Sequence, residues 1–151
     1  MLTFHQSHWG IDQWVGYLRD KEIPVLPRSQ AAMIVLRDEP PEEHERMSPR
    51  ALTDFVYSDP YLALKLLRNA EHRRSRRLGQ ETTTALAAVL QLGYDDMVHL
   101  VCDSAITDAA QAGANHCVAH AVMAAHIARA WAIYRVDVSP DEVTLAALLS
   151  D

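Results

Sequence analysis

The sequence predicts an all-α domain built of several helices, and three observations favour that fold class. Apolar residues recur every three or four positions, which is the spacing of a buried helix stripe, and no segment alternates as a half-buried strand does. Prolines follow Ser or Asp at three places, which is the pattern of a helix start. The length of 151 residues, of which 49% are apolar, is typical of one domain with its own core. We therefore expect a single domain over residues 1–151.

The composition excludes several classes of protein. There are 14 Lys and Arg against 20 Asp and Glu, a net charge of −6, and this moderate charge with so many apolar residues excludes a disordered chain. No apolar run approaches the ~20 residues that a membrane-spanning helix needs. Residues 1–6 lack the basic and apolar parts of a secretory signal, so we expect a cytoplasmic protein without a membrane partner.

Four helices are expected in the first half of the chain. The first has apolar residues at helical spacing, namely Ile11, Trp14, Val15 and Leu18. The second begins at Pro27 and runs to about Arg37, and an acidic, proline-broken connection follows over residues 38–46. Ser48-Pro49 and Asp59-Pro60 each place a capping oxygen before a proline that needs no backbone donor, so they begin the third and fourth helices.

Four more helices are expected in the second half. A helix that starts within residues 80–84 ends at Leu92-Gly93, where glycine supplies a left-handed C-terminus. Residues 94–110 form the next helix, Gly113 breaks it, and residues 115–135 form the longest one. This longest helix is apolar on nearly all sides, so we expect it to be buried at the centre of the domain. The segment Ser-Pro-Asp-Glu at residues 139–142 is a capping box that opens the last helix.

The last helix is expected to leave an apolar face uncovered. Its apolar residues Val143, Leu145 and Leu148 run up to Asp151 without a cap or a glycine. We therefore expect that the chain is cut from a longer one and that the face over residues 140–151 has no cover. Because a partner usually buries such a face, we expect the chain to self-associate, most simply as a symmetric dimer.

The strongest local charge lies in residues 65–77, which hold six basic residues and one acidic residue, a charge of +5. Four guanidinium groups there have the geometry to bind phosphate oxygens, namely Arg73, Arg74, Arg76 and Arg77. The alternative is a solvated helix end, where cations also complement the helix dipole. The other residues carry 8 basic and 19 acidic side chains, a charge of −11, and no aromatic residues lie among the arginines. Nucleic acid is therefore not the expected partner.

Two imidazoles, His116 and His120, stand four positions apart, so they share one side of the longest helix at a spacing that can hold a metal ion. The segment has the outline of a zinc metalloprotease motif, but Cys117 stands where the general-base glutamate belongs. Met123 and Ile127 continue the same stripe, which indicates an inward face. The alternative is therefore a pair of core histidines.

Five segments of the chain, in this order, resemble the HDOD domain (HD-related output domain) of bacterial signalling proteins. They are Ile23-Pro24-Val25-Leu26-Pro27, Ser58 to Arg68 with its Asp-Pro helix start and Leu-Leu-Arg run, Ala88 to Gly93, His116 with the Ala-rich helix after it, and Leu145 to Asp151. The resemblance covers about residues 20–151. It implies an HD-like helical domain truncated at its C-terminus, because the family continues beyond this point.

The resemblance also implies the remnant of a metal site. The related HD phosphohydrolases hold a metal with a histidine and a paired His-Asp, and Ser150 stands here in place of the paired histidine. Only His116 and Asp151 carry over from that set, with His120 as a substitute for one missing ligand. Phosphoester hydrolysis needs a cation held by several ligands, and a serine hydroxyl is a poor ligand. We therefore expect no catalytic residue, no cofactor and no bound metal.

These features favour a non-catalytic signal-transduction module that packs against another signalling domain or protein. Two alternatives stay open at this stage. The first is a metal-dependent phosphohydrolase whose remaining ligands lie beyond residue 151, which requires a divalent metal. The second is a module that binds a nucleotide or nucleic acid through the arginines of residues 65–77, in which case binding depends on salt.

Overall fold

The computed structural model describes residues 8–38, 47–74, 82–108 and 110–150. These residues form eight α-helices and no strand, which confirms the predicted all-α class. The helices are α1 (Ile11–Arg19), α2 (Pro27–Asp38), α3 (Pro49–Val56), α4 (Pro60–Arg74), α5 (Ala85–Leu92), α6 (Tyr94–Cys102), α7 (Ala112–Ala132) and α8 (Pro140–Leu148). Of the connection expected over residues 38–46, the described part includes only Asp38, which is the last residue of α2.

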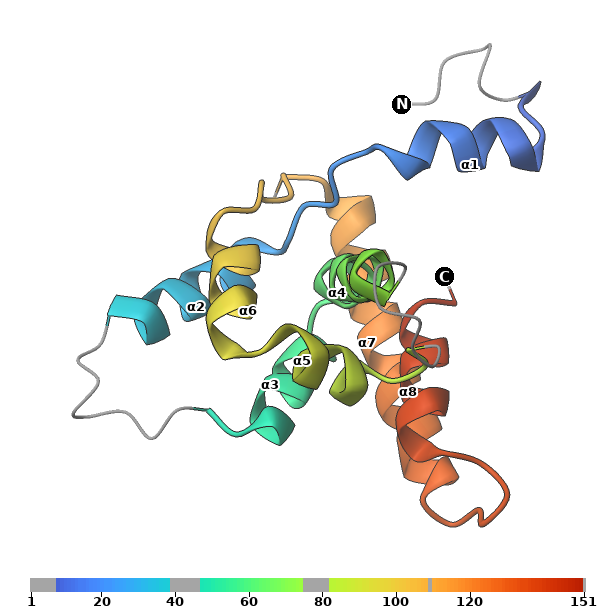
Figure 1. Ribbon diagram of the computed structural model, residues 1–151. Helices are drawn as coiled ribbons and strands as arrows, with labels where there is room; N and C mark the ends of the chain where they lie inside the picture. Colours follow the sequence, from blue (N-terminus) through green and yellow to red (C-terminus); the bar gives the residue numbers. More distant parts are fainter. Residues whose placement is uncertain (1–7, 39–46, 75–81, 109, 151) are drawn as a thin grey trace.

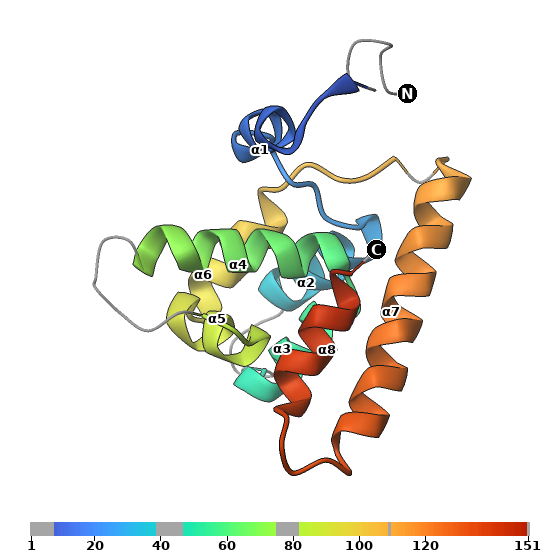
Figure 2. The same cartoon turned by 90° about the vertical axis from the view of Figure 1, so that its right-hand side faces the viewer.

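Helices α2–α6 form the body of the molecule, and α7 and α8 form an antiparallel pair along one side of it, as Figure 1 shows. Within the body, α2 packs on α6, and α5 lies against α3, α4 and α6. The α8 helix contacts both α7 and α5, and α7 runs along the edge of the molecule in Figure 2. In both views α1 lies beyond the rest of the molecule, and none of its residues is buried.

The core lies among the body helices and α8. Its largest fully buried side chains come from four helices: Met33, Leu62, Leu66, Met97 and Leu148. No single helix in the described part of the chain is long and apolar enough to cross a membrane. Among the described helices, the pair α5 and α6, bent by 100° at Gly93, reaches that length and composition, and both helices contribute side chains to the core.

Helix boundaries follow the local capping signals that the sequence predicts. The Ser48 hydroxyl accepts a hydrogen bond from the Ala51 N–H (3.2 Å), and the Ser139 hydroxyl accepts one from the Glu142 N–H (3.4 Å). In each case proline follows at the start of the helix, where no backbone donor is needed. Gly93 has a φ of 84°, in the left-handed region that favours glycine, and it separates α5 from α6.

The Asp59 carboxylate joins the start of α4 to the chain that enters α2. This side chain is fully buried. Its Oδ1 accepts hydrogen bonds from the backbone N–H groups of Tyr61 (3.0 Å) and Leu62 (3.1 Å), in the first turn of α4. Its Oδ2 accepts one from the Leu26 N–H (2.8 Å), 33 residues away in the sequence. The predicted cap of α4 therefore also fixes the entry of α2.

The α6 helix ends earlier than the sequence predicts. A helix is expected over residues 94–110, but α6 ends at Cys102. The Ser104 hydroxyl donates a hydrogen bond to a carbonyl in the last turn of α6 (2.5 Å), and the chain then forms an isolated parallel bridge with Val25. In this bridge the Val25 N–H donates to the Ala105 carbonyl at 2.9 Å. Pairing with a segment far away in the sequence therefore replaces the last part of the predicted helix.

The α7 helix lies at the edge of the molecule, so the prediction that residues 115–135 form a central helix is wrong. Only four of its residues are buried, and three of these are alanines: Val118, Ala121, Ala125 and Ala132. Met123 is 63% exposed and Trp131 is 74% exposed. The physical reason is that α8 and the body cover only one side of α7. Gly113, which was expected to break the chain before this helix, lies within its first turn.

The apolar face of α8 is covered, contrary to the expectation for residues 140–151. Leu145 and Leu148 are buried, in a cluster that includes side chains of α7 and α5. The uncovered apolar surface lies on α7 instead. The predicted uncovered face on α8 is therefore wrong for the described part of residues 140–151, and self-association itself stays a prediction.

Candidate functional site

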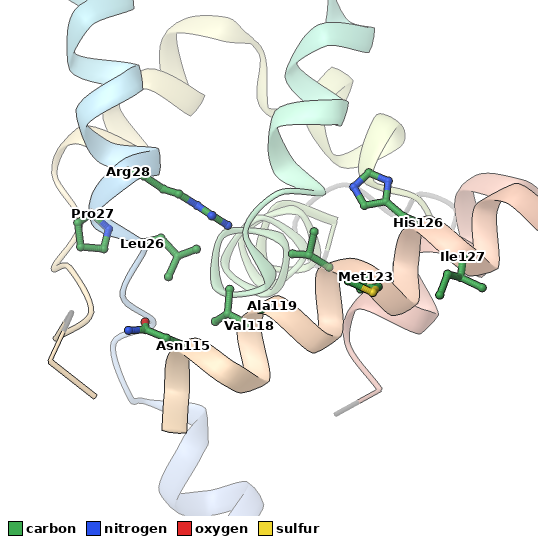
Figure 3. A pocket seen from close by; sticks show the side chains of 10 residues that line it. Leu26, Pro27, Arg28, Asn115, Val118, Ala119, Met123, His126 and Ile127 are labelled. Atoms are coloured by element: carbon green, nitrogen blue, oxygen red, sulfur yellow. The ribbon is translucent and has the colours of Figure 1, made fainter. Parts of the chain in front are cut away.

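A groove of about 760 Å³ opens between the start of α2 and the outward side of α7, and Figure 3 shows its lining. One wall is formed by Leu26, Pro27 and Arg28. The other wall is formed by seven side chains of α7: Asn115, Val118, Ala119, Val122, Met123, His126 and Ile127. A concave, mainly apolar site of this size has room for several side chains of a bound molecule.

The α2 wall is held in place by contacts with the start of α4. Asp59 accepts the hydrogen bond from the Leu26 N–H, and Pro27 begins α2 immediately afterwards. Because proline fixes its own φ, the direction of the chain at this wall is defined. The Arg28 guanidinium donates to the Ser58 carbonyl at 2.6 Å, and Figure 3 shows this side chain extending into the space between the walls.

The α7 wall is an apolar stripe. Ala119, Met123 and Ile127 follow one another at four-residue spacing, so they share one side of the helix, and all three are exposed. Exposed apolar residues continue along the end of α7 and beyond it: Trp131, Ile133, Tyr134 and Val136. Exposed apolar surface gathered on one element in this way is typical of a site that contacts another molecule.

Arg28 gives the groove its positive charge. Arg28 is an exposed cation on the α2 wall, and the His126 imidazole lies on the α7 wall, as Figure 3 shows. Among the described residues that line the groove, none is acidic. The groove therefore suits a mainly apolar ligand that carries negative charge at the end facing Arg28.

The two candidate metal-binding histidines, His116 and His120, are exposed on α7. They lie on the outward side, as Met123 and Ile127 do, so the interpretation of that stripe as an inward face is wrong. The described residues contain no group of three or more His, Cys, Asp or Glu side chains placed to hold a metal ion. The other candidate, Asp151, lies outside the described residues.

A second, smaller cavity of the described residues lies beside α8, and it is apolar. This cavity of about 190 Å³ lies where α4, α7 and α8 meet, and its lining is mainly apolar: Pro60, Tyr61, Leu64, Cys117, Val118, Ala121, Leu148 and Leu149. Next to it in the sequence, the Ser150 hydroxyl donates to the Ala147 carbonyl at 2.9 Å. A divalent cation needs several oxygen or nitrogen ligands, and the described residues around this cavity do not fit that requirement.

The basic segment, residues 65–77, is tied into the fold where it is described. The Arg73 guanidinium lies 2.6 Å from the Asp96 carboxylate of α6, so a phosphate at Arg73 would have to compete with that carboxylate. The remaining candidates are Arg74, which is the last residue of α4, and Arg76 and Arg77, which lie outside the described residues. In the described part of the segment, Arg73 thus forms an ion pair between α4 and α6 and does not belong to a cluster of arginines.

Sequence reasoning did not find the groove, because its two walls are far apart in the chain. The one signal in the sequence is the four-residue spacing of Ala119, Met123 and Ile127, which fits an outward stripe as well as an inward one. Neither Arg28 nor His126 belongs to a motif that predicts a binding site. Their position in the groove depends on the packing of α7 beside the start of α2.

Comparisons of the chain with protein-family models, with curated proteins and with solved structures find no match. The function proposed below is therefore based on the groove and on the resemblance of five sequence segments to the HDOD domain.

Proposed function

We propose that the chain is a non-catalytic regulatory module of the HDOD type, and that it acts by binding an amphipathic helix of a protein partner in the groove between α2 and α7. The observation that carries this proposal is the exposed apolar stripe of α7 beside the Leu26–Arg28 wall. The order of the sequence segments that resemble HDOD domains supports the signalling role.

The shape of the groove suits a helix. The stripe from Ala119 to Ile127 covers about 12 Å of helix axis, which is a little over two turns. A partner helix binds such a stripe with apolar residues at i, i+3, i+4 and i+7, which is a common mode of peptide recognition. Arg28 at the groove wall favours a partner that carries an acidic residue at that end.

A buried contact between a lysine and a serine, in the described part of the chain, has a structural role. The Lys65 ammonium donates to the Ile23 carbonyl (3.0 Å) and to the Ser104 hydroxyl (2.5 Å). A catalytic Ser–Lys pair needs the lysine to accept the proton of the serine. Here the Ser104 hydroxyl donates to the Leu100 carbonyl, and the lysine is the donor. The pair therefore closes the end of α6 against the segment that precedes α2.

Photo-cross-linking inside the native cells tests the proposal. A photoreactive phenylalanine derivative replaces Met123 in the groove or, as a matched control, Leu90, which is 61% exposed on α5. We expect a discrete cross-linked partner from position 123 and none from position 90. A second substitution in the groove, Ala119→Glu, should reduce the yield at least several-fold, because it places a charge in the apolar stripe.

Two results would contradict the proposal. One is equal cross-linking, or none, from both positions. The other is metal-dependent release of phosphate from phosphoesters by the purified chain that is lost in His116→Ala, because this result would favour the phosphohydrolase alternative.

A further inference from the structure

The α1 helix is amphipathic, and its apolar side is exposed in the described part of the chain. Its apolar residues Ile11, Val15 and Leu18 share one side and are all exposed, Ile11 by 81%. An isolated helix of nine residues is marginal in water, because helices shorter than about 12 residues need packing to persist. Packing against a surface that covers its apolar side would therefore stabilise α1.

The segment that follows α1 is fixed in a direction that keeps the helix away from its own body. The Lys21 carbonyl accepts a hydrogen bond from Arg68 (2.6 Å), and the Ile23 carbonyl accepts one from Lys65 (3.0 Å). The Lys21 N–H closes the end of α1 by donating to the Leu18 carbonyl at 3.2 Å. The α1 helix therefore continues directly into residues 21–23, which these hydrogen bonds hold on α4. It projects from the molecule in both Figure 1 and Figure 2.

We propose that the groove between α2 and α7 receives α1 of a second copy of this chain, and that the exchange is reciprocal in a two-fold symmetric dimer. This proposal rests on the proposed function, because it names the helix that occupies the same groove. The two surfaces match in length: the apolar side of α1 from Ile11 to Leu18 covers about 10.5 Å of helix axis, and the stripe of α7 covers about 12 Å. They also match in charge, because Asp12 lies in the first turn of α1 and Arg28 lies in the groove.

Reciprocity follows from the size of the contact. A stable protein–protein interface buries more than about 1,000 Å² in total, and a second helix-in-groove contact doubles the buried area. A two-fold axis gives each dimer two such contacts, and it leaves neither an α1 helix nor a groove unoccupied. A head-to-tail exchange would instead continue into a filament.

Cysteine cross-linking between two differently tagged chains tests this arrangement. Both chains carry Cys117→Ala, which removes the exposed native thiol of α7. One chain carries Val15→Cys in α1 and the other carries Met123→Cys in the groove, and the control pair replaces the latter with Leu90→Cys. Since Val15, Met123 and Leu90 are all exposed, these variants should fold. We expect a covalent hetero-dimer on oxidation of the first pair and at least tenfold less from the control pair.

Light scattering of the unmodified full chain at micromolar concentration should give the mass of two copies, and Leu18→Glu in α1 should give the mass of one. A single-copy mass for the unmodified chain would overturn the proposal. A disulfide between Val15→Cys and Met123→Cys within one copy of the doubly substituted chain would also overturn the proposal, because α1 would then occupy its own groove. If the chain is a single copy while position 123 cross-links a different protein in cells, the dimer is wrong and the proposed function holds. If position 123 cross-links nothing, both fail.

Discussion

Replacing Asp59 with alanine removes the carboxylate that three backbone N–H groups share. Two of these groups belong to the first turn of α4, and the third is the Leu26 N–H beside the groove. The side chain is fully buried, so water does not replace it at low cost. Loss of a helix cap costs about 1 kcal/mol. A buried N–H left without a partner costs about 1–3 kcal/mol. We therefore expect Asp59→Ala to lower the free energy of unfolding by about 2–4 kcal/mol.

Urea unfolding followed by circular dichroism measures this loss. Asp59→Asn keeps one acceptor oxygen and should lose less than Asp59→Ala. Asp54 provides the matched control, because its carboxylate is exposed and lies 3.1 Å from the Arg129 guanidinium. An exposed ion pair contributes under about 1 kcal/mol, so Asp54→Ala should change stability little. A loss for Asp59→Ala no larger than that for Asp54→Ala would contradict the assigned role of the buried carboxylate.

Two further predictions concern the core and its response to pH. Leu66→Ala should lower the free energy of unfolding by about 2–5 kcal/mol, because Leu66 is fully buried. Leu64→Ala, on the exposed side of the same helix, should lower it by under about 1 kcal/mol. Equal losses in urea unfolding would contradict the assignment of Leu66 to the core. Burial and the nearby charge of Asp141 raise the pKa of Tyr57 to about 12, so the neutral phenol is favoured in the folded state. This contribution to stability is present below a pH of about 10, which is the pKa of tyrosine in the unfolded chain. It is lost as the pH rises through the pKa of Tyr57 in the folded chain. Tyrosinate absorbance should therefore show one late titration that Tyr57→Phe removes, and a common midpoint near the ordinary pKa for all tyrosines would contradict it.

Helix starts were predictable because their signals are local. Ser48 and Ser139 each bond to a backbone N–H three residues later, and proline follows each of them. Thr84 bonds in the same way to Ala87, at the end of the stretch where the sequence places a helix start. Such contacts lie within one helical turn, so the order of neighbouring residues determines them.

Contacts between distant segments were not predictable from pattern alone. The second oxygen of Asp59 accepts a hydrogen bond from the Leu26 N–H, and the Val25 N–H donates one to the Ala105 carbonyl. Neither contact has a local signal in the sequence. The orientation of α7 fails for a related reason. A helix that is apolar on nearly all sides has a weak preference for any one side, so the packing of α8 and the body decides which side is covered. The groove is the consequence, since it forms on the side that remains open.

Both proposals for the groove require the Met123 side of α7 to be an open surface of a folded chain. The free energy of unfolding of Met123→Glu tests it most directly, in urea, at a concentration where light scattering gives a single copy. Ala125→Glu, on the covered side of the same helix, is the control and should lose several kcal/mol, because it places a charge in the core. We expect the free energy of unfolding of Met123→Glu to stay within about 0.5 kcal/mol of that of the unmodified chain. A loss as large as that of Ala125→Glu would contradict it, because Met123 would then belong to the core.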